Sequence, residues 1–526
     1  MSSVNINEYY DGKNVLITGA TGFIGKLLIE KLLYSCDTLN KIYCVIRDKN
    51  GHSAEERLNE ITSCKVFDKL RKKDPNFRDK LVPITGNILE NDLNINGRTL
   101  GELKDNVNII FNLAGTVDLD LDIKTSLMTN VHGLRQVVNL SKKLDKLEAF
   151  VHISSIYANS DESFIDEKVY SSEVEPQKIL NLLEWMEDEW LKLGTKKLIQ
   201  GKPNTFAYTK WIGETLLEQE AGDLPVVIVR PSTVGASWKE PFAGWVEKSS
   251  GPCDIFIAAG RGYLRSMKGE GHAVLDMVPV DIVVNLLISS AWSKATQSNR
   301  HILTEEEKKF QIYNCTTGGL NPFRWGEMEN FVTQYSKNTP FEGAFRRPNL
   351  TLTSNSLVHD YWVFISHLIP AYLSDFGLAL IGQKPRVVNV YKNIHKMLGS
   401  IEYLTELDLK CNYDSVIALR NSIQESDSPV FFIDPRAIHW PTYIENYLIG
   451  TKKYLLNEDL HGVPAAKRHL KTLRNIRWFA NIVIGVLIWR LLIAKSQPAR
   501  NVWYLVLSLA AKFVRFFRIS STMIKQ

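Results

Sequence analysis

A strand, a glycine-rich turn and a helix follow one another near the start of the chain, and this unit constrains the fold more than any other feature. Residues 15–25 read Val-Leu-Ile-Thr-Gly-Ala-Thr-Gly-Phe-Ile-Gly, and leucines at helical spacing follow. Gly19 permits the tight turn, Gly22 lets backbone N–H groups approach a pyrophosphate, and Gly25 lets the helix pack close to the sheet. The positive end of the helix dipole adds to the attraction. The segment therefore predicts a dinucleotide site.

Short apolar segments alternate with helical patterns over about the first 320 residues. The strand candidates are residues 15–18, 42–46, 81–85, 107–113, 150–154, 225–230 and 312–315. Residues 125–144 and 205–220 are among the helices between them. Continuous apolar runs are typical of strands buried on both faces. The alternation predicts an α/β fold with a doubly wound parallel (Rossmann) sheet, whose ligands bind at the carboxyl ends of the strands.

The pattern changes after residue 350. Residues 361–378 and 387–404 predict helices with broad apolar faces. We therefore expect a nucleotide-binding reductase domain over residues 10–345, a smaller C-terminal helical domain over residues 350–457, and a membrane-associated tail over residues 478–519.

The tail contains two apolar stretches. Residues 478–494 are apolar except for Asn481 and Arg490, and these 17 residues span roughly 25 Å as a helix, slightly less than a ~30 Å hydrocarbon core. Pro498 ends this run, and in the second stretch Lys512, Arg515 and Arg518 recur every three residues, the pattern of an interfacial helix. A buried C-terminal hairpin is the alternative.

Basic residues that precede the tail favour a main domain on the cytosolic side of the membrane. The endoplasmic reticulum is the expected location, with peroxisomes and lipid droplets as alternatives. A net charge of +5 over 526 residues gives no reason to expect a nucleic-acid partner. The six cysteines are scattered without metal or redox spacing, so we expect reduced thiols and no metal. The N-terminus has no pattern of a cleaved signal peptide.

Residues at the predicted strand ends are candidates for the cofactor site. Arg47 follows the second strand, where an arginine accommodates the 2′-phosphate of NADP(H), although Asp48 beside it leaves NAD possible. Asn87 and Ile88 follow the third strand, Ala114 and Gly115 follow the fourth, and Pro231 lies at the end of the sixth. Ordinary strand–loop chemistry is the alternative for each.

Two side chains are candidates for catalysis. Ser155 ends the fifth strand, where its hydroxyl can donate to a substrate carbonyl. Lys210 lies in the next long helix, where an ammonium group can bind the nicotinamide ribose and lower the pKa of a nearby phenol. Asn130 is a candidate for supporting the sheet and a proton path.

Several motifs together resemble the fatty acyl-CoA reductases, an extended branch of the short-chain dehydrogenase/reductase superfamily. They occupy residues 19–25, 53–58, 67–70, 130–133, 152–158, 230–235, 240–245, 276–285 and 321–322. The most specific pair is Glu-Pro-x-x-Gly-Trp at 240–245 followed by Val-Pro-Val-Asp at 278–281. The C-terminal helical region and the apolar tail agree with membrane-bound members.

The resemblance implies a four-electron reduction of long-chain acyl-CoA by NADPH. One hydride expels CoA and gives an aldehyde, and a second gives a fatty alcohol. By the same resemblance, Ser155 polarises the carbonyl, Lys210 holds the ribose and Arg47 binds the adenosine end. The pyrophosphate would lie on Gly19, Thr21, Gly22, Phe23, Ile24 and Gly25.

The chain departs from the family pattern at two positions. Phe206 stands four residues before Lys210, where the superfamily has its catalytic tyrosine, and Asn87 stands where an aspartate is usual. Tyr208 cannot replace that tyrosine, because two residues along a helix rotate a side chain by about 200°. A missing general acid costs ~10²–10⁴-fold in rate. A catalytically impaired paralogue that binds NADP(H) or acyl-CoA is therefore the alternative function; a sterol reductase is a third, which the helical domain and residues 240–245 disfavour.

Overall fold

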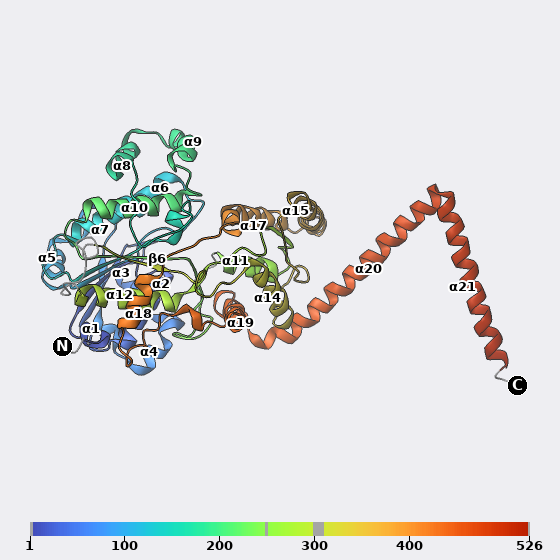
Figure 1. The fold of residues 1–526 in the computed structure, drawn as a ribbon. Coiled ribbons are helices and arrows are strands. Elements are labelled where there is room, and N and C mark those ends of the chain that lie inside the picture. The colour runs from blue at the N-terminus through green and yellow to red at the C-terminus, as the bar shows by residue number, and fades with distance from the viewer. Residues whose placement is uncertain (1–3, 248–250, 298–309, 524–526) are drawn as a thin grey trace.

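A parallel sheet of seven strands forms the centre of the computed structural model, which describes residues 4–247, 251–297 and 310–523 (Figure 1). The strand order is β10-β6-β5-β4-β1-β2-β3. The strands are β1 (Asn14–Thr18), β2 (Lys41–Ile46), β3 (Leu81–Thr85), β4 (Ile109–Asn112), β5 (Ala149–Ile153), β6 (Val226–Pro231) and β10 (Phe310–Cys315). Each predicted strand is present, which confirms the doubly wound α/β fold.

The strand order reverses between β1 and β4. The chain runs outward from β1 to β2 and β3 in one direction, then from β4 to β10 in the other. In doubly wound sheets, loops that leave the two strands at such a switch point turn to opposite sides, and dinucleotides bind between them. The glycine turn after β1 lies at this switch point.

Helices cover both faces of the sheet, which explains the apolar strands. Val15 and Ile17 of β1 belong to one core cluster, and Leu16 belongs to the other, because successive side chains point to opposite faces. The first cluster includes α2 (Phe23–Ser35), α3 (Ala54–Ser63) and α12 (Val280–Gln297). The second includes α5 (Gly97–Asn106), α6 (Ile123–Leu127), α7 (Gly133–Ser141) and α10 (Thr205–Glu220).

The helix predicted over residues 125–144 contains a π turn. It consists of α6, a π turn at Met128–His132 and α7. The wider turn includes Asn130, whose side chain accepts from the N–H of Thr116 (2.8 Å) and donates to Thr209 Oγ1 on α10 (3.0 Å). Sequence periodicity does not reveal such a turn, and π turns often occur at functional sites.

Smaller elements complete the main body. The helices are α1 (Ile6–Tyr10), α4 (Asp68–Lys73), α8 (Pro176–Trp185), α9 (Asp188–Leu198), α11 (Pro252–Gly260) and α14 (Trp325–Asn338). β7 (Thr233–Gly235) pairs with β9 (Met277–Pro279), and β8 (Ser266–Lys268) pairs with β11 (Thr351–Thr353), both in parallel.

The region after residue 350 is mainly helical, as predicted. It contains α15 (Ser356–Val363), a π turn (Phe364–Leu368), α16 (Ile369–Leu380), α17 (Val387–Ile401), α18 (Asp414–Ser422) and α19 (Trp440–Gly450). Side chains of α17, α18 and α19, such as Ile394, Val416 and Tyr443, share one core cluster with strands of the sheet. The domain boundary near residue 350 stays a prediction.

The tail forms two long helices that extend away from the body (Figure 1). The polar and apolar segments predicted on either side of residue 478 are one helix, α20 (Val463–Lys495). α21 (Gln497–Met523) begins at the predicted break beside Pro498, and the rings of Trp489 and Trp503 meet across the corner at 6.0 Å. Lys512 and Arg515 are exposed, and the side chain of Arg518 lies outside the described residues.

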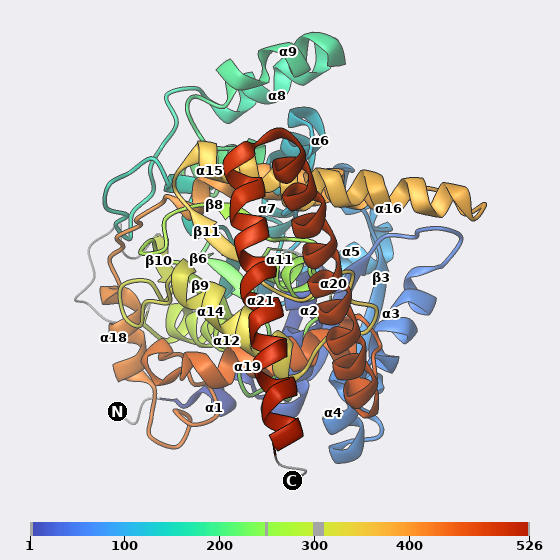
Figure 2. The same cartoon turned by 90° about the vertical axis from the view of Figure 1, so that its right-hand side faces the viewer.

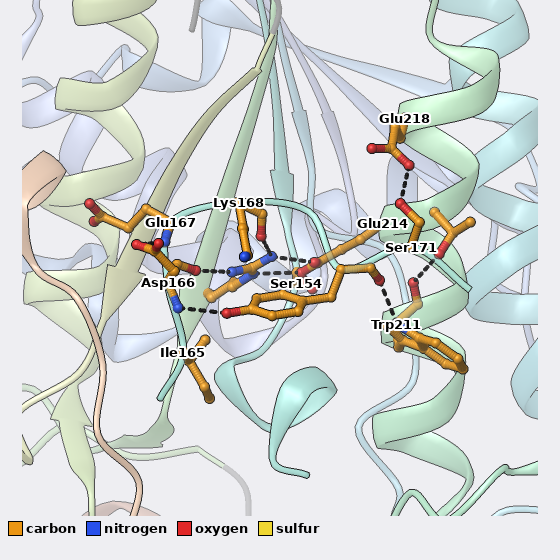
Figure 3. Close-up of polar contacts among 12 residues, drawn as sticks. Ser154, Ile165, Asp166, Glu167, Lys168, Ser171, Trp211, Glu214 and Glu218 are labelled. Carbon is orange, nitrogen blue, oxygen red and sulfur yellow. Dashed lines mark hydrogen bonds and ion pairs between the residues drawn. The ribbon is translucent and has the colours of Figure 1, made fainter. Parts of the chain in front are cut away.

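One buried ion pair joins α10 to the centre of the sheet. Arg230 of β6 and Glu214 of α10 are fully buried, with guanidinium–carboxylate distances of 2.9 and 2.6 Å. Figure 3 shows Glu214 reaching from α10 toward Ser154, whose hydroxyl donates to it at 2.5 Å. Arg230 also donates to the main-chain carbonyls of Asp166 (3.0 Å) and Lys168 (2.7 Å). The pair therefore connects β5, β6, α10 and the loop after β5.

We expect Arg230→Met or Glu214→Gln to lower the free energy of unfolding by about 3–5 kcal/mol, because each substitution leaves the opposite charge of the pair buried without its counter-ion. The matched control is Arg135→Met, which breaks the more exposed pair between Arg135 of α7 and Glu220 of α10 and should cost about 1 kcal/mol. Denaturant unfolding followed by circular dichroism measures both. Equal losses in the two pairs would contradict this prediction.

Candidate active site

The glycines of the first turn allow backbone segments to meet without side chains between them. Gly19 has a φ of +75°, and a Cβ there would lie 2.7 Å from the backbone of Leu113 and Ala114 after β4. A Cβ on Gly25 would lie 2.3 Å from the carbonyl oxygen of Gly19, so the start of α2 packs closely against the turn that follows β1. Any side chain at these positions would fill the cradle.

The N-terminus of α2 faces this cradle. Gly22 is the N-cap residue and has no side chain with which to cap the first N–H groups of the helix. Thr21, Phe23 and Ile24 are partly buried around the same turn. Free N–H groups and the helix dipole make this a site for an anion such as a pyrophosphate.

A line of hydrogen-bonded side chains crosses the carboxyl ends of β1, β4 and β5. The hydroxyl of Thr18 donates to Asn112 Oδ1 (2.6 Å), and the amide of Asn112 is 3.1 Å from His152 Nδ1. The N–H of Ala114 donates back to Thr18 Oγ1 at 3.3 Å. Burial, with the nearby charge of Lys210, holds the pKa of His152 well below its ordinary value. The imidazole is therefore neutral and its role here is structural.

Lys210 projects from α10 into the edge of the sheet. Its ammonium donates to the carbonyl of Ile153, two residues before Ser155, at 2.9 Å. A Cβ on Gly115 would lie 3.5 Å from Lys210 Nζ and 2.9 Å from Asn130 Oδ1, so Gly115 makes room for both side chains. Burial lowers the pKa of Lys210 to about 8, against the opposing effect of Glu214. The fold thus brings Gly115, Asn130 and Lys210 together at the end of β5, two residues before Ser155.

Phe206 precedes Lys210 by four residues on the same helix, so one helical turn separates the two side chains. Ser155 is buried, caps a short 3₁₀ turn (Ile156–Asn159), and its Oγ accepts the N–H of Tyr157 at 3.3 Å. Phe206 is 7% exposed. A phenyl ring in this place fills the volume of a tyrosine ring but offers no proton.

Tyr208 faces away from this site, as the helical rotation predicts. Its ring belongs to the apolar cluster on the α7 side of the sheet and lies 6.0 Å from the ring of Trp211. Burial raises the pKa of Tyr208 to about 12. It is therefore poorly placed to supply a proton beside Lys210.

Two other tyrosines near the start of α10 were not predicted. The hydroxyl of Tyr157 is 2.9 Å from Thr233 Oγ1, and its ring meets that of Tyr403 edge-on at 6.4 Å. Burial raises the pKa of Tyr403 to about 12, and the nearby Asn204, the residue that caps α10, opposes this effect. Tyr157 lies within one of the family-like motifs at 152–158, so its presence there was visible, but nothing local in the sequence indicates that Tyr403 joins it.

The residues predicted for the adenosine end lie after β2 and β3. Arg47 is exposed, whereas the carboxylate of Asp48 accepts the N–H of Ala54 (2.9 Å) and so caps α3. Arg57 of α3 donates to the carbonyl of Arg47, which brings a second guanidinium to this corner. Asn87 closes its own turn by accepting the N–H of Leu89 at 3.2 Å.

The other two predicted residues are held by neighbouring elements. Ile88 packs where a Cβ on Gly133 would approach within 2.9 Å. Pro231 ends β6 opposite Cys315 of β10, and the next residue, Ser232, donates its N–H to Cys315 at 3.1 Å. Both lie at the carboxyl edge of the sheet, the edge that carries the glycine cradle.

The glycine cradle at a β1/β4 switch point is typical of the doubly wound, nicotinamide-dinucleotide-binding class. Residues 17–287 match the NAD-binding family model described as male sterility protein, and residues 366–458 match a second model with the same description. The reductase domain of a nonribosomal peptide synthetase from Mycobacterium tuberculosis has the same fold, with a TM-score of 0.56 and 19% identity over 85% of this chain and 92% of that one.

Full-length relatives specify the family. The chain is 46% identical to fatty acyl-CoA reductase 1 of Mus musculus and of Homo sapiens, over 99% of each chain. It is 42% identical to fatty acyl-CoA reductase 2 of Mus musculus, over 98% of this chain and 99% of that one. The protein therefore belongs to the fatty acyl-CoA reductase family and is an oxidoreductase.

We expect dinucleotide affinity to fall as the pH rises through about 8. The pKa of Lys210 is lowered from its ordinary 10.5 to about 8, so the ammonium that can bind a ribose hydroxyl is present below that pH and lost above it. Loss of a charge-assisted hydrogen bond should weaken binding about tenfold. Fluorescence titrations across this range measure the effect. Lys210→Met should bind weakly at every pH, and a step that persists in this variant would assign the titration to another group.

Proposed function

We propose that the protein reduces long-chain fatty acyl-CoA to fatty alcohol through the aldehyde, with NADPH as the reductant. The observation that carries this proposal is the position of Lys210, held between Gly115 and the end of β5 beside Ser155. The full-length likeness to fatty acyl-CoA reductases supports the substrate class.

The residues of the first turn fit a dinucleotide. Gly19 and Gly25 leave a cradle that a Cβ would fill, and α2 begins there without a side-chain cap. When bound, the cofactor supplies the hydride. Arg47, with Arg57 beside it, gives a 2′-phosphate two cationic neighbours, while one carboxylate oxygen of Asp48 already accepts the N–H of Ala54. These contacts favour NADPH over NADH.

Ser155 and Lys210 have separate tasks in this proposal. The Ser155 hydroxyl donates to the carbonyl oxygen of the thioester and then of the aldehyde. Lys210 orients the nicotinamide ribose from its place against Ile153. Hydride attack on the thioester gives an oxyanion that collapses to the aldehyde and expels CoA thiolate, whose conjugate thiol has a pKa near ~8.5. Hydride attack on the aldehyde leaves an alkoxide, a much stronger base that must gain a proton.

Phe206 favours a second candidate function. Because no phenol stands before Lys210, the alkoxide has no acid at the place where the superfamily provides one. A paralogue that binds NADP(H) and acyl-CoA without complete turnover is the second candidate, and the buried phenyl ring of Phe206 is the observation that supports it.

We propose that the tail holds the protein on a membrane, with the main body on the cytosolic side. In the described residues two helical segments are apolar and long enough to cross a bilayer, and one of them is the tail segment Leu460–Lys495. None of its most apolar window is buried in the body, which argues against a buried hairpin. The endoplasmic reticulum remains the expected location.

Arg47→Ala should weaken NADPH binding about tenfold and leave NADH binding unchanged, because only the 2′-phosphate gains a charge-assisted contact. Lys146→Ala is the matched control, since it removes one exposed cation from the loop before β5, at the amino-terminal ends of the strands. Titration of both cofactors into the three proteins measures this. Equal loss of NADPH and NADH affinity would contradict a role for Arg47 at the phosphate.

Phe206→Tyr should raise alcohol formation about 10²-fold or more, because it restores the acid that protonates the alkoxide. Products from a labelled long-chain acyl-CoA, with NADPH consumption, are the measurement. We expect the unchanged chain to stall at the aldehyde.

Tyr208→Phe is the control for that experiment, since this phenol faces the opposite cluster and its loss should leave the product ratio unchanged. Abundant alcohol from the unchanged chain would show that another group or water supplies the proton. No product from either the unchanged chain or Phe206→Tyr would favour the non-catalytic paralogue.

A further inference from the structure

The segment Ser356–Leu380, which contains α15 and α16, presents large apolar side chains to solvent. It is apolar and long enough to cross a membrane, yet only 17% of its most apolar window is buried. A core helix of similar composition would be mostly covered. Six exposed side chains show the character of the outer face: Tyr361, Trp362, Phe364, Tyr372, Leu373 and Phe376.

The inner face of the same segment carries buried polar side chains beside two apolar ones, Ala371 and Leu378, which pack against α17, so it is more polar than the inner face of an ordinary surface helix. His367 is buried and its Nε2 accepts the N–H of Arg265 at 3.0 Å. His359 Nδ1 lies 3.0 Å from the hydroxyl of Ser266, in β8. Asp375 accepts the N–H groups of residues 386–388, at 2.9, 2.8 and 2.9 Å, and so caps α17. Polar contacts therefore hold the segment to the body while its apolar groups point outward.

This arrangement cannot turn over to hide its apolar face. Rotation about the helix axis would separate His359, His367 and Asp375 from their hydrogen-bond partners. None of these side chains would gain a new partner in exchange. Soluble proteins seldom expose a continuous apolar surface of this kind unless another surface covers it. The hydrogen bonds thus hold the apolar side chains of the segment toward solvent, where another surface is expected to cover them.

The position and composition of the surface favour lipid. Figure 1 places α15 at the end of the body toward which α20 extends, and Figure 2 shows α16 projecting from the body at that end. Tyrosine and tryptophan side chains are enriched where proteins meet the membrane interface. Exposed Lys384 and Arg386 follow α16 directly, where they would meet anionic headgroups.

We propose that Ser356–Leu380 lies in the plane of a lipid bilayer and forms a second membrane contact beside the tail. The segment does not span, because its inner face is hydrogen-bonded to β8 and α17 along its length. It instead inserts its outer side chains to the depth of the headgroup–acyl boundary, as amphipathic interfacial helices do. The inference extends the proposed membrane association of the tail, and its test separates the two contacts.

One helix, α17, also connects this contact to residues near the proposed catalytic site. Asp375 of the segment caps the N-terminus of α17, and the turn that follows α17 carries Tyr403, which meets Tyr157. One helix therefore joins the bilayer contact to the residues beside Ser155. A substrate with a long acyl chain partitions into lipid, so this placement brings the proposed catalytic site near the membrane that holds the substrate.

A lipid-quenching experiment on the full chain tests the inference. The cysteines other than Cys64 are buried, so a Cys64→Ser background accepts one new labelling site at a time. Leu373→Cys places an NBD fluorophore on the outer face of α16, Ile484→Cys places it on the tail, and Lys146→Cys is the aqueous control. The proteins are bound to phosphatidylcholine–phosphatidylserine vesicles, with or without lipid that carries a doxyl nitroxide near the headgroup.

The label at 373 should shift to shorter emission wavelength on vesicles and lose most of its emission to the doxyl lipid, while the label at 146 should do neither. Quenching at 484 but not at 373 would overturn the inference and leave the tail proposal standing. Quenching at neither site would overturn both. If the label at 373 shifts without lipid, in proportion to protein concentration, a second copy covers the surface and the inference is wrong.

Discussion

The buried pair of Arg230 and Glu214 is the interaction on which the arrangement of the site depends. Both side chains are fully buried, so their charges are stable only while each faces the other. Glu214 belongs to the helix that carries Phe206 and Lys210, and it also accepts from Ser154 beside Ser155. The distance between α10 and the end of β5, and with it the distance between Lys210 and a carbonyl on Ser155, follows from this one contact.

The same contact leaves the loop after β5 free to vary in sequence. Arg230 binds main-chain carbonyls of Asp166 and Lys168, which every amino acid provides. The loop is held by its backbone, whereas its side chains remain available for other partners: Asp166 for Asn412 and Glu167 for the N–H of Ser415. Parts of the C-terminal helical region are thereby attached to the sheet through Asp166 and Glu167, further along the loop than Ser155.

Local chemistry predicted much of this structure. Unbroken apolar runs and the glycine spacing gave all seven strands and the cradle, because buried parallel strands and tight turns leave strong local patterns. The rotation between Phe206 and Tyr208 placed one beside Lys210 and the other in the opposite cluster. The π turn at Asn130 and the meeting of Tyr403 with Tyr157 depend on packing between distant segments, which no local pattern records. The apolar face of residues 361–378 was visible, but its outward orientation is decided by where His367 and Asp375 find partners.

The reversed polarity of α15 and α16 has a practical consequence for anyone who handles the protein. A chain shortened at residue 477 would lose the most apolar part of α20 and all of α21, yet Trp362, Leu373 and Phe376 would still be exposed to solvent. Removal of the tail therefore does not by itself yield a surface suited to aqueous buffer. Crystallisation or calorimetry of the catalytic body would need a detergent or a short-chain lipid, chosen to cover a helix that lies flat and not one that spans.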